Sequence, residues 1–176
     1  MTSIVVAFHS GYGNTERVAR AVASGAGADL LRVDTIDAEG WSLLDAADAV
    51  VFGCPTYMGG PSAPFKAFAD ASSGIYANRS WQDKLAAGFT NSGSLNGDKL
   101  ATLQYLAQFA AQHGMQWAPL GLGSVAENRL GAYLGLMTQS ADGATEPADL
   151  AAAESFGDRL RLLAARWTGS LAAVSR

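Results

Sequence analysis

The sequence predicts an α/β fold, a five-stranded parallel sheet with helices on both faces. Short apolar runs alternate with stretches in which apolar residues recur at the spacing of a helix. Within the runs nearly every residue is apolar, which is typical of parallel strands buried on both faces. The chain has 176 residues, about the length of one domain, and we expect residues 1–167 to form that domain.

Four of the runs are predicted as strands, and they cover residues 4–8, 30–33, 49–53 and 85–89. Three helical stripes accompany them: Val18, Ala19, Val22 and Ala23; Leu100, Leu103, Ala107, Ala110 and Ala111; Leu150, Ala153, Leu160, Leu163, Ala164 and Trp167. The stretch 119–147 is rich in Gly, Ala and Ser and contains a candidate strand at residues 133–138. We expect a long surface excursion there that interrupts or precedes the fifth strand, and a frayed tail at residues 168–176.

The composition excludes several classes of protein. A hydrophobic content of 49% and a net charge of -4 are typical of a globular protein with a sizeable core. No stretch gathers lysines or arginines for nucleic acid, and no apolar run approaches the ~20 residues of a membrane span. Cys54 is the only cysteine, and no carboxylate pair or histidine cluster suggests a metal or a catalytic side chain. We therefore expect a cytoplasmic protein with neither membrane nor nucleic-acid partners.

The loop after the first strand is the first candidate site. It reads Ser10-Gly11-Tyr12-Gly13-Asn14-Thr15 and turns directly into a helical pattern. Ligands of open parallel sheets bind outside the carboxyl ends of the strands, where glycines let backbone N–H groups converge. The helix that follows adds unsatisfied N–H groups and the positive end of its dipole. This combination suits a phosphate that is held by hydrogen bonds rather than by a countercharge.

Several interpretations of this loop compete. A nucleoside triphosphatase loop is disfavoured, because it requires a lysine after its last glycine. A dinucleotide fingerprint is half present in Gly11 and Gly13, with Asp34 at a suitable distance for a ribose, but Glu16 stands at its third glycine. The remaining interpretations are a flavin phosphate loop and an ordinary helix N-cap made by Asn14 or Ser10. The loop alone leaves these interpretations open.

Two further strand ends favour the flavin. The sequence CPTYMGGPSAPFKAF follows residues 49–53, and TNSGSLNGDK follows Phe89. Because the carboxyl ends of parallel strands share one edge of a sheet, all three loops converge there. Their Gly, Ser, Thr and Asn residues offer donors for a flat ring with carbonyl groups and ring nitrogens, and Pro55, Tyr57 and Met58 offer apolar walls.

In this order and spacing, the motifs resemble those of flavodoxin-like FMN proteins, most closely the WrbA-type NAD(P)H:quinone oxidoreductases. The resemblance covers nearly the whole chain and implies a flavodoxin-like fold in which three segments bind FMN. These segments are Ser10, Gly11, Tyr12, Gly13, Asn14 and Thr15; Pro55, Thr56, Tyr57, Met58 and Gly59; and Asn91, Ser92, Gly93, Ser94, Leu95 and Asn96. Gln112-His113-Gly114-Met115 is similar to a family motif that places His113 beside the flavin. Tyr12 matches a position implicated in pyridine-nucleotide contact, and Tyr76 matches an aromatic residue that lines the substrate space.

The resemblance implies an enzyme that transfers electrons from NAD(P)H to a quinone or similar small acceptor by a ping-pong mechanism. The flavin performs the chemistry, and N–H groups of Ser92 to Leu95 would stabilise negative charge on the reduced ring. It also implies a homo-oligomer, a tetramer or a dimer. The alternative is a non-catalytic electron carrier of the flavodoxin type, which usually presents an acidic face to its partners. Glu16 and Asp98 are the nearest acids here, and this scarcity favours the enzyme. Three departures from the family pattern are Tyr57 for an arginine, Asn96 for a histidine and Tyr76 for a tryptophan.

Overall fold

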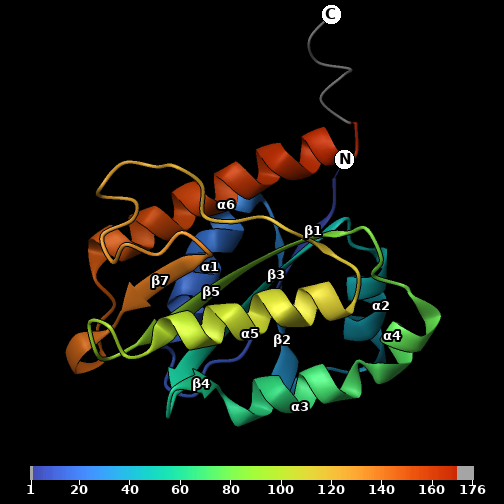
Figure 1. The fold of residues 1–176 in the computed structure, drawn as a ribbon, viewed down its shortest axis with the longest axis horizontal. Helices are drawn as coiled ribbons and strands as arrows, with labels where there is room; N and C mark the ends of the chain where they lie inside the picture. Colours follow the sequence, from blue (N-terminus) through green and yellow to red (C-terminus); the bar gives the residue numbers. More distant parts are fainter. Residues whose placement is uncertain (1, 170–176) are drawn as a thin grey trace, which may run out of the picture.

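A parallel sheet with the strand order β2-β1-β3-β5-β6 forms the centre of the molecule in the computed structural model, which describes residues 2–169 (Figure 1). Its strands are β1 Ile4–Phe8, β2 Asp29–Arg32, β3 Ala49–Tyr57, β5 Leu85–Ser92 and β6 Gln116–Trp117, with the short β4 Gly60–Pro61 beside β3 and β7 Leu136–Gln139 beside β5. The predicted α/β fold and its helices on both faces are confirmed.

Two layers of helices cover the sheet (Figure 1). One layer consists of α1 Asn14–Ala26 and α6 Pro147–Trp167, and the other of α2 Ala38–Ala46, α3 Ala63–Ala71, α4 Ser73–Asn78 and α5 Lys99–Gln112; η1 Val33–Thr35 and η2 Ala141–Gly143 are short 3-10 turns. Within β1, Val6 packs toward the first layer while Val5 and Ala7 pack toward the second. Both faces of this strand are therefore buried, as its continuous apolar run predicts. None of the helices in residues 2–169 is long and apolar enough to cross a bilayer.

The long surface excursion divides the fifth strand into two pieces, β6 and β7, rather than preceding it. β6 pairs with Leu85 and Ala86 at the start of β5, and β7 pairs with residues 89–92 at its end. Residues 118–135 run between these two pieces, so both lie along the same edge of β5. The predicted strand at 133–138 exists, but it spans Leu136–Gln139.

Two predicted loops begin as strands. β3 continues to Tyr57 and returns through the antiparallel β4, because Met58 and Gly59 adopt φ of 49° and 81° in a tight turn. β5 likewise continues to Ser92, and Pro55 pairs with Asn91. The predicted ends at residues 53 and 89 are therefore too early, and β4 makes the sheet not wholly parallel. These extensions are held by backbone hydrogen bonds to the neighbouring strands. Such bonds require no apolar side chains, so hydrophobic patterning does not predict the extensions.

The predicted apolar stripe that begins at Leu100 is rotated in the structure. In α5, Leu100 is 49% exposed, whereas Lys99 and Thr102 are fully buried. The buried polar side chains are satisfied by hydrogen bonds, so this face of the helix is not apolar throughout. Hydrophobic periodicity alone therefore misplaces the face by one residue.

Helices α1 and α6 cross in backbone contact. A Cβ atom at Gly157 would overlap the carbonyl oxygen of Val22, and one at Gly25 would overlap the carbonyl oxygen of Glu154. Glycine at both positions therefore lets the helices approach more closely than side chains would permit. α6 ends at Trp167, and of the tail predicted to fray, residues 170–176 lie outside the described residues.

Candidate functional site

A cavity of about 430 Å³ opens where the carboxyl ends of β1, β3, β5 and β7 meet. Its volume is in the range of ordinary ligand pockets. The lining residues are Tyr12, Asn14, Thr15, Pro55, Thr56, Tyr57, Asn91, Ser92, Gly93, Ser140 and Gly143. The three predicted segments are thus brought together at one edge of the sheet. None of the lining residues is charged, so a ligand here is held by hydrogen bonds and aromatic contacts.

The first loop presents unpaired donors. Gly13 has a φ of 84°, which favours glycine, and α1 begins at the next residue. Within residues 2–169, the backbone N–H groups of Gly11, Tyr12, Asn14 and Thr15 have no hydrogen-bond acceptor. The Thr15 hydroxyl has no partner among these residues either, although Thr15 as a whole is only 2% exposed. These groups form the anion site that the helix N-terminus predicts.

Ser10 completes this loop. Its Oγ accepts a hydrogen bond of 3.1 Å from the N–H of Gly13. The hydroxyl proton of Ser10 is therefore still available to a ligand oxygen. The buried Ser10 side chain thus both shapes the turn and adds a donor to it.

The cations near the loop are held by protein oxygens. Arg32 donates to Asp34 at 2.8 Å, to Glu16 at 3.2 Å and to the carbonyl of Ser10 at 3.3 Å. Burial is the largest single influence and favours the neutral acid at Asp34, but the hydrogen bond from Arg32, a backbone hydrogen bond and the nearby positive charges together outweigh it, so the pKa of Asp34 is lowered. Because Asp34 is engaged with Arg32, the dinucleotide interpretation loses its ribose ligand.

Arg17 donates to Asn14 Oδ1 and to the carbonyl of Gly143, both at 3.0 Å, and so links the loop to η2.

Two tyrosines form an aromatic wall. The rings of Tyr12 and Tyr57 lie 6.2 Å apart between centroids and meet edge to face at 71°. A Cβ atom at Gly11 would lie 2.7 Å from the Tyr57 hydroxyl, so the glycine admits this side chain beside the loop. Tyr12 is 85% exposed, and burial raises the pKa of Tyr57. A flat ligand can therefore reach this wall from solvent, and Met58 at the hairpin tip is fully exposed beside it.

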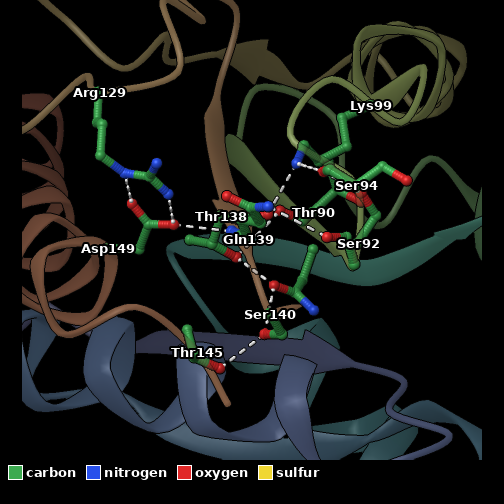
Figure 2. A network of polar contacts seen from close by, with 12 residues as sticks. Thr90, Ser92, Ser94, Lys99, Arg129, Thr138, Gln139, Ser140, Thr145 and Asp149 are labelled. Atoms are coloured by element: carbon green, nitrogen blue, oxygen red, sulfur yellow. Dashed lines mark hydrogen bonds and ion pairs between the residues drawn. The ribbon is translucent and has the colours of Figure 1, made fainter. Parts of the chain in front are cut away.

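The side chain of Asn91 is oriented by Thr138 and Ser140, which the sequence did not indicate; Figure 2 labels these two residues and Thr145. The Oδ1 of Asn91 accepts hydrogen bonds of 2.9 Å from the hydroxyls of Thr138 and Ser140, and Ser140 is bonded to Thr145 at 2.8 Å. With both lone pairs of the oxygen occupied, the Asn91 amide has its NH₂ group left to offer to the cavity. Ser140 follows the carboxyl end of β7, and its place there is the signal that could have identified it.

The third segment also exposes donors. In the part of the chain that the structure describes, the backbone N–H groups of residues 93–97 have no acceptor. Gly93 lines the cavity, whereas Leu95 is 61% exposed at the rim. The Ser92 hydroxyl donates to the carbonyl of Ser94 at 3.1 Å and so closes the turn on itself.

The Thr56 side chain points away from the cavity. Its hydroxyl lies 2.8 Å from that of Thr90 and 2.7 Å from that of Thr102, in a buried cluster between the sheet and α5. Thr56 can therefore bind a ligand in the cavity through its backbone but not through its hydroxyl.

Comparison with known proteins identifies the family. The sequence profile of NADPH-dependent FMN reductases matches residues 38–128. The chain is 48% identical to the flavodoxin FldP of Pseudomonas aeruginosa over 151 residues, which cover 80% of this chain and 82% of that protein. The chain belongs to the flavodoxin-like family of FMN proteins. A WrbA-like flavodoxin from Agrobacterium tumefaciens superimposes with a TM-score of 0.83 and 47% identity over 94% of this chain and 99% of that one. The flavodiiron protein of Giardia intestinalis shares the fold at a TM-score of 0.70 and 18% identity, over 97% of this chain and 38% of that one.

The cavity fits the FMN of this flavodoxin-like family. Unpaired N–H groups and two hydroxyls gather at the start of α1, where they can bind a phosphate. The Asn91 amide and the N–H groups of residues 93–97 can bind the carbonyl groups and nitrogens of a flavin ring. Tyr12 and Tyr57 can contact its apolar surface. The donor set therefore matches a molecule with a phosphate at one end and a polar aromatic ring at the other.

Two residues of the predicted flavodoxin-like site lie elsewhere. Tyr76 is in α4 and His113 caps α5, and their rings are 6.1 Å apart. α5 starts beside the cavity and runs about 20 Å to the opposite, amino-terminal end of the sheet, where both residues lie (Figure 1). The Nε2 of His113 is 2.9 Å from the Ser72 hydroxyl, its ring contacts Trp81, and burial lowers its pKa. Within one chain, neither residue reaches the cavity.

Proposed function

We propose that this flavodoxin-like protein is an FMN-dependent oxidoreductase that transfers electrons from NAD(P)H to a quinone or similar small acceptor by a ping-pong mechanism. The observation that carries the proposal is the wall of Tyr12 and Tyr57, which borders the cavity and is open to solvent. Flat aromatic substrates stack well on such side chains. When bound, FMN supplies the chemistry, accepting a hydride and passing two electrons on. A cytoplasmic location, where a lone thiol such as Cys54 stays reduced, belongs to the same proposal.

The residues of the chain bind and orient in this proposal, and none acts as acid or base. The hydroxyls of Ser10 and Thr15 and the N–H groups of the first loop hold the phosphate. The NH₂ group of Asn91 and the backbone of residues 93–97 bind the ring, and their N–H dipoles favour negative charge on it. Tyr12 contacts the nicotinamide nucleotide.

The alternative is an electron carrier that docks on other proteins. The name of the flavodoxin FldP, at 48% identity, favours it. Against it, the acids nearest the first loop are engaged: Glu16 pairs with Arg20 at 2.6 Å and Arg32 at 3.2 Å, and Asp34 pairs with Arg32. An acidic docking face of the carrier type is therefore weakly developed.

The proposed function is tested by purifying the protein and following NADH and NADPH oxidation with and without benzoquinone. We expect a yellow protein whose nicotinamide oxidation accelerates when the quinone is added. A flavin-containing protein that oxidises neither nucleotide would contradict the enzyme and leave the carrier. A protein that binds no flavin would contradict both.

FMN rather than FAD is expected as the tight ligand. The first loop accommodates one terminal phosphate, and the uncharged cavity offers no group that recognises an adenosine diphosphate. Mass spectrometry of the cofactor released by heat decides between them, with dissociation constants of both flavins measured on the apoprotein. FAD recovered as the main species, or bound more tightly, would overturn this expectation.

Tyr76 would reach a substrate only in a homo-oligomer, a dimer or a tetramer. Tyr76 is 51% exposed at the end of the sheet opposite the cavity, so only a neighbouring subunit could place it there. We expect Tyr76→Ala to raise the quinone KM about tenfold, since aromatic contacts contribute about 0.5–1.5 kcal/mol and 1.4 kcal/mol is tenfold. FMN content should not change.

The matched control is Tyr133→Ala, which removes another exposed tyrosine from the excursion. Size-exclusion chromatography with light scattering accompanies the kinetics. A monomeric active enzyme, or equal KM values in the two variants, would remove Tyr76 from the substrate site.

A further inference from the structure

Lys99 is a fully buried lysine beside the flavin cavity. Its side chain is 0% exposed, although lysine is rarely buried without a partner. The Nζ donates to the carbonyl of Ser94 at 2.9 Å and to the carbonyl of Thr138 at 3.1 Å (Figure 2). One ammonium group thus links the third FMN-binding segment to strand β7.

The peptide group that follows Thr138 is held from both sides. Its carbonyl accepts from Lys99, and its N–H, that of Gln139, donates to Asp149 at 2.7 Å. Asp149 in α6 is 2% exposed and binds Arg129 of the excursion through two hydrogen bonds of 3.0 and 2.9 Å. The charged groups that act on Lys99 from the surrounding elements are therefore Asp149 and Arg129.

Burying this ammonium opposes its charge. Burial lowers the pKa of Lys99 to about 8, and Asp149 offsets this only in part. An apolar side chain of similar size would fill the space without that desolvation. The presence of a lysine at this position is therefore better explained by the roles of the two residues whose carbonyls accept its hydrogen bonds, Ser94 and Thr138. Ser94 lies within the segment of unpaired N–H groups, and Thr138 donates to the Asn91 oxygen that leaves the amide NH₂ for the cavity.

We propose that Lys99 is a positioning residue for the flavin ring, which fixes the Ser94 turn and the Asn91 amide and places a positive charge next to the ring-binding segment. This inference rests on the proposed function only in taking FMN as the occupant of the cavity. Preformed donors bind the ring without an ordering penalty. A buried positive charge favours the reduced, more negative form of FMN over the oxidised form.

The test is Lys99→Met, with Lys66→Met as the matched control, because Lys66 is an exposed lysine of α3 that pairs with Asp70 on the surface of its own helix. We expect Lys99→Met to weaken oxidised FMN about tenfold in fluorescence titrations of the apoprotein. We expect a further tenfold loss for reduced FMN, which lowers the two-electron midpoint potential by about 30 mV. Lys66→Met should change neither. A dissociation constant and potential equal to those of the wild type, in a folded Lys99→Met protein, would overturn the inference.

The wild-type protein provides a second test if Lys99→Met does not fold. Between about pH 7 and pH 9 Lys99 loses its charge, so FMN affinity should fall over this range. In Lys99→Arg, whose guanidinium stays charged, the affinity should be nearly independent of pH over the same range. Equal pH profiles would overturn the inference. Nicotinamide oxidation is measured separately, so wild-type protein that binds FMN but oxidises no nucleotide would refute the proposed function and leave the role of Lys99 standing.

Discussion

Replacing Ser10 and Thr15 together by alanine is expected to weaken FMN binding by roughly two to four orders of magnitude. A hydrogen bond to a charged group contributes about 1.5–3 kcal/mol, and each 1.4 kcal/mol is tenfold in affinity. Thr15 is the stronger candidate of the two, because its hydroxyl has no protein partner within residues 2–169 although the residue is almost wholly buried at the edge of the cavity. Ser10→Ala also releases the N–H of Gly13, so the two effects need not add.

The measurement is a fluorescence titration of apoprotein with FMN and, separately, with riboflavin. The double variant should lose affinity for FMN while its weak affinity for riboflavin, which carries no phosphate, stays the same. Ser42→Ala is the control, because the hydroxyl of this exposed residue donates to the carbonyl of Ala38 in its own helix. Equal affinity of the double variant and the wild type for FMN would place the phosphate elsewhere.

Gly157→Ala should destabilise the fold strongly for so small a change. The added methyl group would overlap the Val22 carbonyl, so α1 and α6 must move apart and lose contacts between them. Overpacking of this kind costs about 1–3 kcal/mol. In a chain of this size each kcal/mol lowers the Tm by about 2–4 °C. Calorimetry of the apoprotein provides the Tm.

Gly74→Ala is the matched control, because a Cβ atom there meets nothing within 4 Å. In helix α4 this change removes a glycine from a helical position and should stabilise by about 0.5–1 kcal/mol. If the two variants had the same Tm, the α1–α6 contact would be looser than the backbone overlap indicates.

The sequence predicts the fold well because strands buried on both faces are legible as unbroken apolar runs. Residues 4–8 match β1, and the runs at 49–53 and 85–89 mark the starts of β3 and β5. Their ends were missed because Pro55 and Asn91 are paired by backbone hydrogen bonds that depend on no side-chain pattern. The three segments of the cavity were found from Gly, Ser, Thr and Asn residues after successive strands.

What the sequence could not predict depends on tertiary contacts. Ser140 and Gly143 reach the cavity because β7 pairs with β5. This pairing follows the long excursion, for which the sequence predicts no regular path. Thr56 lies at the cavity, but a cluster with Thr90 and Thr102 turns its side chain away. Tyr76 was assigned by resemblance, which carries no information on which end of the sheet the residue occupies in one subunit.

Rapid mixing of the FMN-loaded protein, without oxygen, tests the central claim most directly. The visible flavin absorbance is followed first with NADPH or NADH and then, after reduction, with benzoquinone. The account predicts that at least one nucleotide bleaches the flavin, that the quinone restores it, and that both rates are at least as fast as steady-state turnover. An FMN-loaded protein that a chemical reductant bleaches but neither nucleotide does would contradict the account and leave an electron carrier.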